Sequence, residues 1–429
     1  MKKTYEILKD LPEIKKAAQI LKQDEEHTFE QLKELVLIPA FSRHEEVRAK
    51  RYREMMEAEG FEVTEDEVHN VYTVIRGSGG GPVLYVTGHL DTVFPLDTPL
   101  EVVEKEPGKF YCPGIGDDTS ALAQNLALMR AFRDSGIKLK GDLIIGGNVG
   151  EEGLGDLYGV RNFFGKEENL KLVDGFISVD GQGPSVTYGG TGSYRYKVSF
   201  SNQGGHSNGD FGMPNPIHAM GRAIAKIADV KTPNPPWTTF AVGVVDGGTS
   251  VNSIAHDCEF LLDIRSNGKA ELDAANEEIM KCITDAVAEE NARWKRDEEY
   301  YAHDSGNKKN PVPRADRVVE LKIEKMGDRP VGNQSLDDPI VKAALTLYEV
   351  CGEKAVTNAN GSTDANIPIS LGIPGLAVGR SGKGAGSHSR AEWFSPEGMA
   401  EGEAELFLMI CGLLGVDGVT EPLLPVREK

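Results

Sequence analysis

Residues 82–91, which read PVLYVTGHLD, decide how this 429-residue chain folds. The first six of them, Pro82 to Thr87, form a short apolar run that is typical of a buried parallel β-strand. Gly88 and His89 follow at once, and Asp91 comes two residues later. In open α/β sheets, ligands bind outside the carboxyl ends of the strands. This stretch therefore predicts a buried strand that presents a histidine and a carboxylate at the edge where ligands bind.

Two further apolar runs end in the same way. Residues 143–149 are followed by Glu151 and Glu152, and residues 176–179 are followed by Asp180. Patterns typical of helices separate the runs, and this alternation predicts an α/β fold with a parallel sheet covered by helices. Because the carboxyl ends of parallel strands meet at one edge, we expect the three clusters of acidic and histidine residues to converge there.

The pattern changes at about Ser193. From there the sequence predicts a β-α-β-β-α-β insert, an α+β domain with the ferredoxin-like order, over residues 191–330. Its expected strands and helices are residues 194–200, 215–227, 240–245, 258–264, 270–291 and 318–325. Residues 297–316 are polar and are expected to form a loop. The remaining residues, 1–190 and 331–429, are expected to form one discontinuous domain.

The chain is strongly acidic, with 67 Asp and Glu against 47 Lys and Arg and a net charge of −20. A surface of this sign repels phosphate and anionic lipid, so no nucleic acid and no membrane is expected as a partner. No apolar run approaches the roughly 18 residues of a spanning helix, and the N-terminus lacks the apolar core of a secretory signal. The five cysteines contain no Cys-x-x-Cys pair, so neither disulfides nor a thiolate metal site is expected. These features predict a cytoplasmic protein.

Histidine and carboxylate side chains after the predicted strands are the nitrogen and oxygen ligands that zinc accepts. Asp117 and Asp118 add two adjacent carboxylates in a glycine-rich turn, where they would repel each other strongly without a nearby cation. Near the C-terminus, residues 382–389 (GKGAGSHS) present His388. Taken singly, each of these residues is more simply explained as an ordinary loop or turn residue. Their shared position after predicted strands favours a metal site.

Six short motifs complete this pattern, in the order Gly88-His89-Leu90-Asp91-Thr92, Gly116-Asp117-Asp118, Gly150-Glu151-Glu152-Gly153, Val179-Asp180, Gly204-Gly205-His206-Ser207 and Gly386-Ser387-His388-Ser389. With them the sequence resembles the M20-type zinc metallopeptidase family, which includes peptidase T, carnosine-type dipeptidases, glutamate carboxypeptidase and the acetylornithine and succinyl-diaminopimelate deacylases. The resemblance covers nearly the whole chain. It implies a phosphorylase/hydrolase-like zinc-exopeptidase catalytic domain, with residues 191–330 as a lid through which a homodimer forms.

The resemblance implies that five side chains hold two divalent metal ions. The five are His89 and Asp180 for one ion, Glu152 and His388 for the other, and Asp117 as a bridge between them. A cis peptide would join the bridging aspartate to Asp118. The ions are expected to be zinc, and cobalt or manganese stays open because sites with nitrogen and oxygen ligands tolerate several metals.

Other residues are implied to act on the substrate or on the ligands. Glu151 would be the general base, and Asp91 would orient the imidazole of His89. His206 would donate a hydrogen bond to the tetrahedral oxyanion, from the same chain or from the partner subunit. The expected substrate-binding residues are Arg265, which would hold a carboxylate, together with Asn252, Gly361 and Ser362.

The expected activity is hydrolysis of an amide bond in short peptides, by a di-/tripeptidase or an aminopeptidase. An N-acyl amino acid deacylase or a carboxypeptidase of the same family stays open, because the pocket that distinguishes them cannot be inferred from sequence. A non-catalytic amino acid-binding protein with this fold is the alternative of another class. It would be expected to have lost metal ligands, whereas all five and Glu151 are present. The chain departs from the family pattern after the Asp pair, where it has Thr119-Ser120 and the family often has Lys-Gly or Lys-Ala. This departure leaves the identity of the substrate open.

Overall fold

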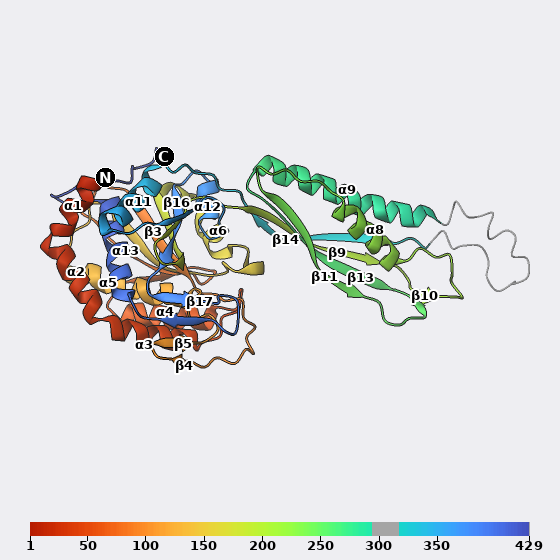
Figure 1. Cartoon of the computed structure of the whole chain (residues 1–429), viewed down its shortest axis with the longest axis horizontal. Coiled ribbons are helices and arrows are strands. Elements are labelled where there is room, and N and C mark those ends of the chain that lie inside the picture. Colours follow the sequence, from red (N-terminus) through yellow and green to blue (C-terminus); the bar gives the residue numbers. More distant parts are fainter. Residues whose placement is uncertain (294–316, 429) are drawn as a thin grey trace, which may run out of the picture. The chain divides into compact units, whose positions relative to one another are not determined.

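The computed structural model describes residues 1–293 and 317–428, and these form two compact units (Figure 1). Unit 1 comprises Met1–Gly190 and Gly332–Lys429, and unit 2 comprises Thr191–Val331. The loop expected at residues 297–316 lies outside the described residues. Within the described ranges, no helix has both the length and the apolar character needed to cross a membrane.

Unit 1 is built around one eight-stranded sheet. In spatial order its strands are β1 (Val63–Glu65), β2 (Val71–Ile75), β6 (Asp142–Asn148), β3 (Val83–His89), β7 (Gly175–Gln182), β16 (Gly375–Arg380), β8 (Ser185–Thr187) and β15 (Val356–Asn358). The central strands β6, β3, β7 and β16 run parallel, as predicted. The expectation of a parallel sheet is wrong at its margins, because β1 pairs antiparallel with β2, β2 with β6, and β8 with β16, whereas β15 pairs parallel with β8. The links from β1 to β2 and from β7 to β8 are too short for a helical crossover, so the chain reverses direction there.

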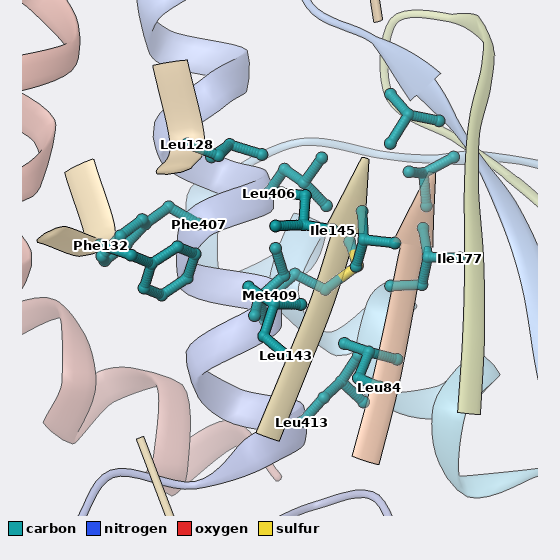
Figure 2. Close-up of a cluster of buried hydrophobic side chains, with 14 of the residues drawn as sticks. Leu84, Leu128, Phe132, Leu143, Ile145, Ile177, Leu406, Phe407, Met409 and Leu413 are labelled. Atoms are coloured by element: carbon teal, nitrogen blue, oxygen red, sulfur yellow. The ribbon is translucent and has the colours of Figure 1, made fainter. Parts of the chain in front are cut away.

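Helices cover both faces of this sheet. They are α1 (Lys2–Asp10), α2 (Pro12–Gln23), α3 (Glu25–Val36), α4 (Glu46–Ala58), α5 (Thr119–Ser135), α6 (Tyr158–Gly165), α7 (Glu167–Leu172), α11 (Pro339–Cys351), α12 (Asn366–Ser370) and α13 (Met399–Leu414), with a 3-10 turn, η1, at Gly153–Gly155. On one face, Phe132 of α5 and Phe407 of α13 belong to the same core as Leu84 of β3 (Figure 2). On the other face, Tyr85 of β3 packs with Phe163 of α6. Strand β3 is therefore buried along its whole length, which explains its run of apolar residues.

The described part of unit 2 contains a four-stranded antiparallel sheet with two helices packed on one face. The strand order is β11 (Thr238–Gly247), β13 (Asp257–Ser266), β9 (Gly192–Ser201) and β14 (Glu320–Arg329), and the helices are α8 (Pro216–Ala228) and α9 (Lys269–Arg293). Alternate strand residues, such as Val198 and Phe260, form a core with these helices. A pair of two-residue strands, β10 (Gly205–His206) and β12 (Ser253–Ile254), is also present. The order of the long elements is β-α-β-β-α-β, as the sequence predicts.

A small second sheet in unit 1 has no counterpart in the sequence analysis. Its strands, in spatial order, are β17 (Lys383–Ala385), β18 (Trp393–Ser395), β5 (Lys109–Tyr111) and β4 (Val103–Glu106). The pairing of β18 with β5 joins two segments that lie far apart in the sequence. It brings the loop between β17 and β18, which carries His388, beside the glycine-rich turn that follows β5.

Candidate metal centre

The functional side chains gather at the carboxyl ends of the four central strands of unit 1. Strand β3 ends at His89, β7 carries Asp180 near its end, and β16 ends at Arg380. Strand β6 ends at Asn148, and Glu151 and Glu152 follow within four residues. Since β6, β3, β7 and β16 are neighbours in the sheet, these side chains meet at one edge.

Three overlapping groups of side chains at this edge are placed to hold metal ions. The groups are His89 with Asp117, Asp118 and Asp180; His89 with Glu151 and Glu152; and Asp117 with Glu152 and His388. Within each group, one ligand atom from every residue lies within 4.8 Å of the others. The structure thus brings together all five residues that the sequence suggested as ligands, and Glu151 with them.

Asp117 stands between the two histidines. Its Oδ1 atom lies 3.3 Å from Nε2 of His89, and its Oδ2 atom lies 3.4 Å from Nε2 of His388. The same nitrogen of His388 lies 2.6 Å from Oε1 of Glu152. A carboxylate whose two oxygens face two different sets of ligands has the geometry of a bridge between two ions.

The imidazole of His89 is oriented by the backbone that follows it. Its Nδ1 atom lies 3.0 Å from the carbonyl oxygen of Asp91 and 3.4 Å from Oδ1 of the same residue. Because these oxygens accept the Nδ1 proton, the Nε2 lone pair is directed toward Asp117 and is available to a metal ion.

The carboxylate of Asp91 also fixes the turn that carries the two glutamates. It accepts hydrogen bonds from the backbone amides of Glu151 and Glu152, both at 2.9 Å, and from the hydroxyl of Ser42 at 2.6 Å. Burial by itself would raise the pKa of Asp91, yet its hydrogen bond and charge interaction with His89 hold that pKa below the usual value. Asp91 is therefore a buried anion that positions both the histidine and the glutamates.

A second buried carboxylate, Glu392, holds the glycine-rich turn that leads to the Asp pair. It accepts the backbone N–H groups of Gly114, Gly116 and Asp117, at 2.8, 2.9 and 2.7 Å. Burial raises the pKa of Glu392 to about 7. The role of Glu392 could not be predicted from the sequence, because its partners lie more than 270 positions earlier in the chain.

The Asp117–Asp118 peptide is cis, as the resemblance implies. Asp118 accepts the backbone N–H of His89 at 2.8 Å, so it braces the end of β3. The hydroxyls of Thr119 and Ser120, which replace the residues common in the family, donate to the carbonyls of Gly114 and Gly116. The departure from the family pattern thus supports the turn and leaves the ligands in place.

Arg380 is part of the centre, and the sequence analysis did not identify it. The guanidinium is buried, with 3% of its side chain exposed. Its Nη1 atom lies 2.9 Å from Oδ1 of Asp117 and 3.1 Å from Oδ1 of Asp118. Arg380 is the last residue of a central strand, so the rule that pointed to His89 and Asp180 applies to it as well.

The charges of the centre fit divalent cations. Burial by itself would lower the pKa of His89, yet the charge of Asp118 holds it well above its usual value. Hydrogen bonds to Asp117 and Glu152 raise the pKa of His388 to about 10. The clustered carboxylates therefore favour positive charge at both imidazoles, and divalent ions bound by nitrogen and oxygen ligands would supply that charge.

The loop with Gly361 and Ser362 is anchored close to this edge of the sheet. Gly361 donates its N–H to the carbonyl of Gly189 at 3.0 Å. In the same loop, Asp364 accepts a hydrogen bond at 2.7 Å from the side chain of Asn148, the last residue of β6. The loop that was expected to contact the substrate is thus tied to the end of a strand beside His89.

The other three expected substrate residues belong to unit 2. His206 lies in β10, where its Nδ1 atom accepts the backbone N–H groups of Asn208 and Gly209. Asn252 lies beside it, and its carbonyl accepts the N–H of Ser207 at 3.0 Å. Arg265 lies on β13, away from this pair of short strands.

Arg265 belongs to a group of charges on the sheet face opposite the helices of unit 2. Its Nε atom lies 2.6 Å from Oδ2 of Asp263, and Nε of Arg195 lies 3.1 Å from Oδ1 of the same carboxylate. Arg265 is half-exposed. One carboxylate, that of Asp263, is thus shared by two guanidinium groups on this face.

Fold and site together define an α/β protein whose central strands end in a cluster of His, Asp and Glu side chains able to hold metal ions. Residues 85–410 match the family described as "Peptidase family M20/M25/M40". The match spans more than half of the chain, and the chain belongs to this family, as the motifs indicated. No curated protein sequence matches the chain.

Solved structures with the same overall fold include three for which the match covers most of this chain and most of the other protein. The aminopeptidase PepT from Bacillus cereus is 18% identical, with a TM-score of 0.67 over 90% of this chain and 98% of its own. Human carnosine dipeptidase 1 is 14% identical, with a TM-score of 0.67 over 92% and 98%. YXEP from Bacillus subtilis, described as a dinuclear metal-binding M20 peptidase, is 17% identical, with a TM-score of 0.61 over 92% and 99%. At these identities the likeness is one of fold, and it confirms the expected fold class.

Proposed function

We propose that the chain hydrolyses an amide bond in short peptides with two divalent metal ions held in the centre of unit 1. One observation carries the proposal: the two oxygens of Asp117 face His89 and His388, at 3.3 and 3.4 Å. Asp180 completes the first set of ligands and Glu152 the second. The membership in a peptidase family agrees with this activity.

The metal ligands and the general base have separate roles in the proposed reaction. When bound, two such ions polarise the scissile carbonyl and lower the pKa of the attacking water. Glu151 takes a proton from that water and passes it to the leaving amine. Glu152 is paired with His388 at 2.6 Å and so belongs to the metal ligands. Glu151 is held next to it by the hydrogen bond that its backbone N–H donates to the carboxylate of Asp91, and it belongs to the group around His89.

His206 has the tautomer that an oxyanion donor needs. Because its Nδ1 atom accepts two backbone N–H groups, the neutral imidazole carries its proton on Nε2. That N–H can donate a hydrogen bond to the oxygen that gains negative charge as water attacks. Asn252, beside it, and the half-exposed Arg265 would bind the substrate, the arginine through a free carboxylate.

We further propose that His206 reaches the centre from a partner subunit of a homodimer. Strand β9 starts at the link to unit 1 and runs for 10 residues, about 33 Å, before the chain turns into β10. His206 therefore lies at the end of unit 2 remote from that link. Strand β11 is an edge strand with exposed Val244 and Val245, each more than half exposed, and it offers a surface for the second copy.

Hydrolysis of a blocked-peptide series tests the proposed function. The purified protein, loaded with Zn²⁺, Co²⁺ or Mn²⁺, is incubated with N-acetylated amino acids and with one di- and tripeptide series in three forms: unblocked, N-acetylated and C-amidated. The proposal predicts cleavage of unblocked peptides that disappears on chelation and returns with metal. Cleavage of N-acylated amino acids alone would support the deacylase instead. A metal-loaded protein that binds these compounds but cleaves none would support the non-catalytic alternative.

A further inference from the structure

Arg380 lies closer to the proposed ligands of one metal ion than to those of the other ion. Its Nη1 atom contacts Oδ1 of Asp117 at 2.9 Å, the oxygen that also faces His89. The same nitrogen lies 4.0 Å from Oδ1 of Asp180. The other oxygen of Asp117, Oδ2, faces His388. The guanidinium therefore stands on the side of the ion that His89, Asp117 and Asp180 would hold.

The guanidinium is held in this position from two directions. Its Nε atom donates to the carbonyl of Gly181 at 2.7 Å, and its Nη1 atom donates to both Asp117 and Asp118. The backbone of Arg380 is fixed by the pairing of β16 with β7, where Arg380 lies opposite Gln182. Arginine does not lose its proton in proteins, so this is a permanent positive charge.

A permanent charge close to a divalent ion opposes the binding of that ion. Coulomb repulsion falls with distance, so it acts more strongly on the ion next to Asp117 Oδ1 than on the ion next to Oδ2. The same charge attracts Asp117, Asp118 and Asp180 when no ion is present. Without it, three neighbouring carboxylates would repel one another in a buried place.

We propose that Arg380 is a built-in cation of the centre that makes its two metal sites unequal. It holds Asp117 and Asp118 in place in the ion-free protein. It also weakens binding of the ion between His89, Asp117 and Asp180, so that this ion binds second and leaves first. Arg380 is thus a positioning residue and not a ligand. This inference rests on the proposed set of five ligands.

Stepwise metal affinity tests the inference without any activity assay. Zn²⁺ binding is measured by competition with a chelator of known affinity for the wild type, Arg380→Gln and Arg380→Lys. Glutamine can still donate to Asp117 but has no charge, whereas lysine keeps the charge. We expect two unequal steps in the wild type and in Arg380→Lys. In Arg380→Gln, the weaker step should tighten by about tenfold or more, the size of the repulsion between a unit charge and a divalent ion ~5 Å apart even in water.

Two further variants assign the weaker step and control for the loss of charge. In the His388→Ala background only the first site keeps its full set of ligands, and there Arg380→Gln should again tighten the remaining ion. Arg133→Gln removes an arginine that pairs with Asp134 and Glu59 at the surface, and it should leave both steps unchanged. An unchanged or loosened weaker step in Arg380→Gln would overturn the inference.

The ion-free state provides a second readout that does not depend on metal affinity. In the presence of chelator, Arg380→Gln should unfold at a lower temperature than the wild type, because Asp117, Asp118 and Asp180 lose their counter-charge. If that variant does not fold without metal, it is purified in loaded form and the rate of Zn²⁺ loss to chelator is measured. The ion that leaves first should be lost more slowly than in the wild type. Faster loss of that ion would contradict the inference. A wild type that binds no ions would instead contradict the proposed function.

Discussion

The Nε2 atom of His388 lies 2.6 Å from Oε1 of Glu152, although the two residues are 236 positions apart in the chain. His388 adopts a left-handed backbone conformation, with φ of 65°, in the loop between β17 and β18. The antiparallel pairing of β18 with β5 fixes where that loop lies. The proposed metal centre therefore depends on a small sheet whose strands have only three or four residues.

Replacing His388 by alanine should remove one metal ion from the centre. The variant loses the imidazole that faces both Glu152 and Oδ2 of Asp117, whereas the ligands of the other ion remain. Metal analysis of the purified variant should give about one ion per chain in place of two. His256→Ala, which removes an exposed histidine in unit 2, is the matched control. Two ions retained in His388→Ala would argue against its role as a ligand.

The variant Glu151→Gln should separate metal binding from proton transfer. Glutamine has the same shape as glutamate, and its backbone N–H can still donate a hydrogen bond to Asp91. Its side chain, however, cannot accept the proton of the attacking water. We expect the full metal content and a kcat lower by about 10²- to 10⁴-fold. Glu167→Gln, on the exposed helix α7, should keep wild-type activity. If Glu151→Gln is fully active, another residue is the base.

Mixing two inactive variants tests whether His206 serves the partner subunit. Glu151→Gln and His206→Ala are each expected to be nearly inactive as homodimers. In a mixed dimer, the subunit with an intact Glu151 would receive the intact His206 of the other subunit. Activity should therefore return when the two proteins are unfolded together and refolded, or co-expressed. No recovery in a sample shown to contain mixed dimers would mean that His206 serves its own chain.

The buried Glu403 should make stability depend on pH. Neither carboxylate oxygen of Glu403 has a hydrogen-bond partner within the described residues, and burial raises its pKa well above the usual value. A raised pKa in the folded state means that Glu403 stabilises the protein least at high pH. Its contribution is complete below pH ~4.3, the unfolded pKa, and is lost as the pH rises toward the folded pKa.

Glu403→Gln removes this titration. Relative to the variant, the wild type should lose up to about 1.4 kcal/mol of unfolding free energy per pH unit above pH ~4.3. Denaturant unfolding of both proteins at pH 5 and pH 8 measures the difference, and Glu421→Gln, at an exposed ion pair with Lys140, is the control. Parallel pH profiles for Glu403→Gln and the wild type would show that Glu403 is ionised in the folded protein.

The central strands and the residues that follow them could be predicted from the sequence for a physical reason. A strand buried on both faces must be apolar throughout, so β3 stands out, and the polar residues at its end stand out by contrast. The alternating pattern of residues 194–200, within β9, indicated a half-buried antiparallel strand, because one face of that sheet is covered and the other is not. The confirmed family and fold class agree with both patterns.

Other features could not be predicted because they depend on long-range pairing. Strands β5 and β18 are too short to show a pattern of their own, and nothing local indicates that they pair. Glu392 binds a turn more than 270 residues earlier in the sequence. Arg380 could not be predicted for a different reason: an arginine is not a metal ligand, so a pattern of metal ligands does not include it. The roles of the site residues, the zinc ions, the dimer and the cytoplasmic location stay predictions.

Anomalous diffraction from crystals of the zinc-loaded protein tests the central claim most directly. The account predicts two anomalous peaks about 3.5–4 Å apart, one on each side of Asp117. The first should lie against His89 and Asp180, and the second against Glu152 and His388. A single peak, or peaks that these five residues do not ligate, would contradict it.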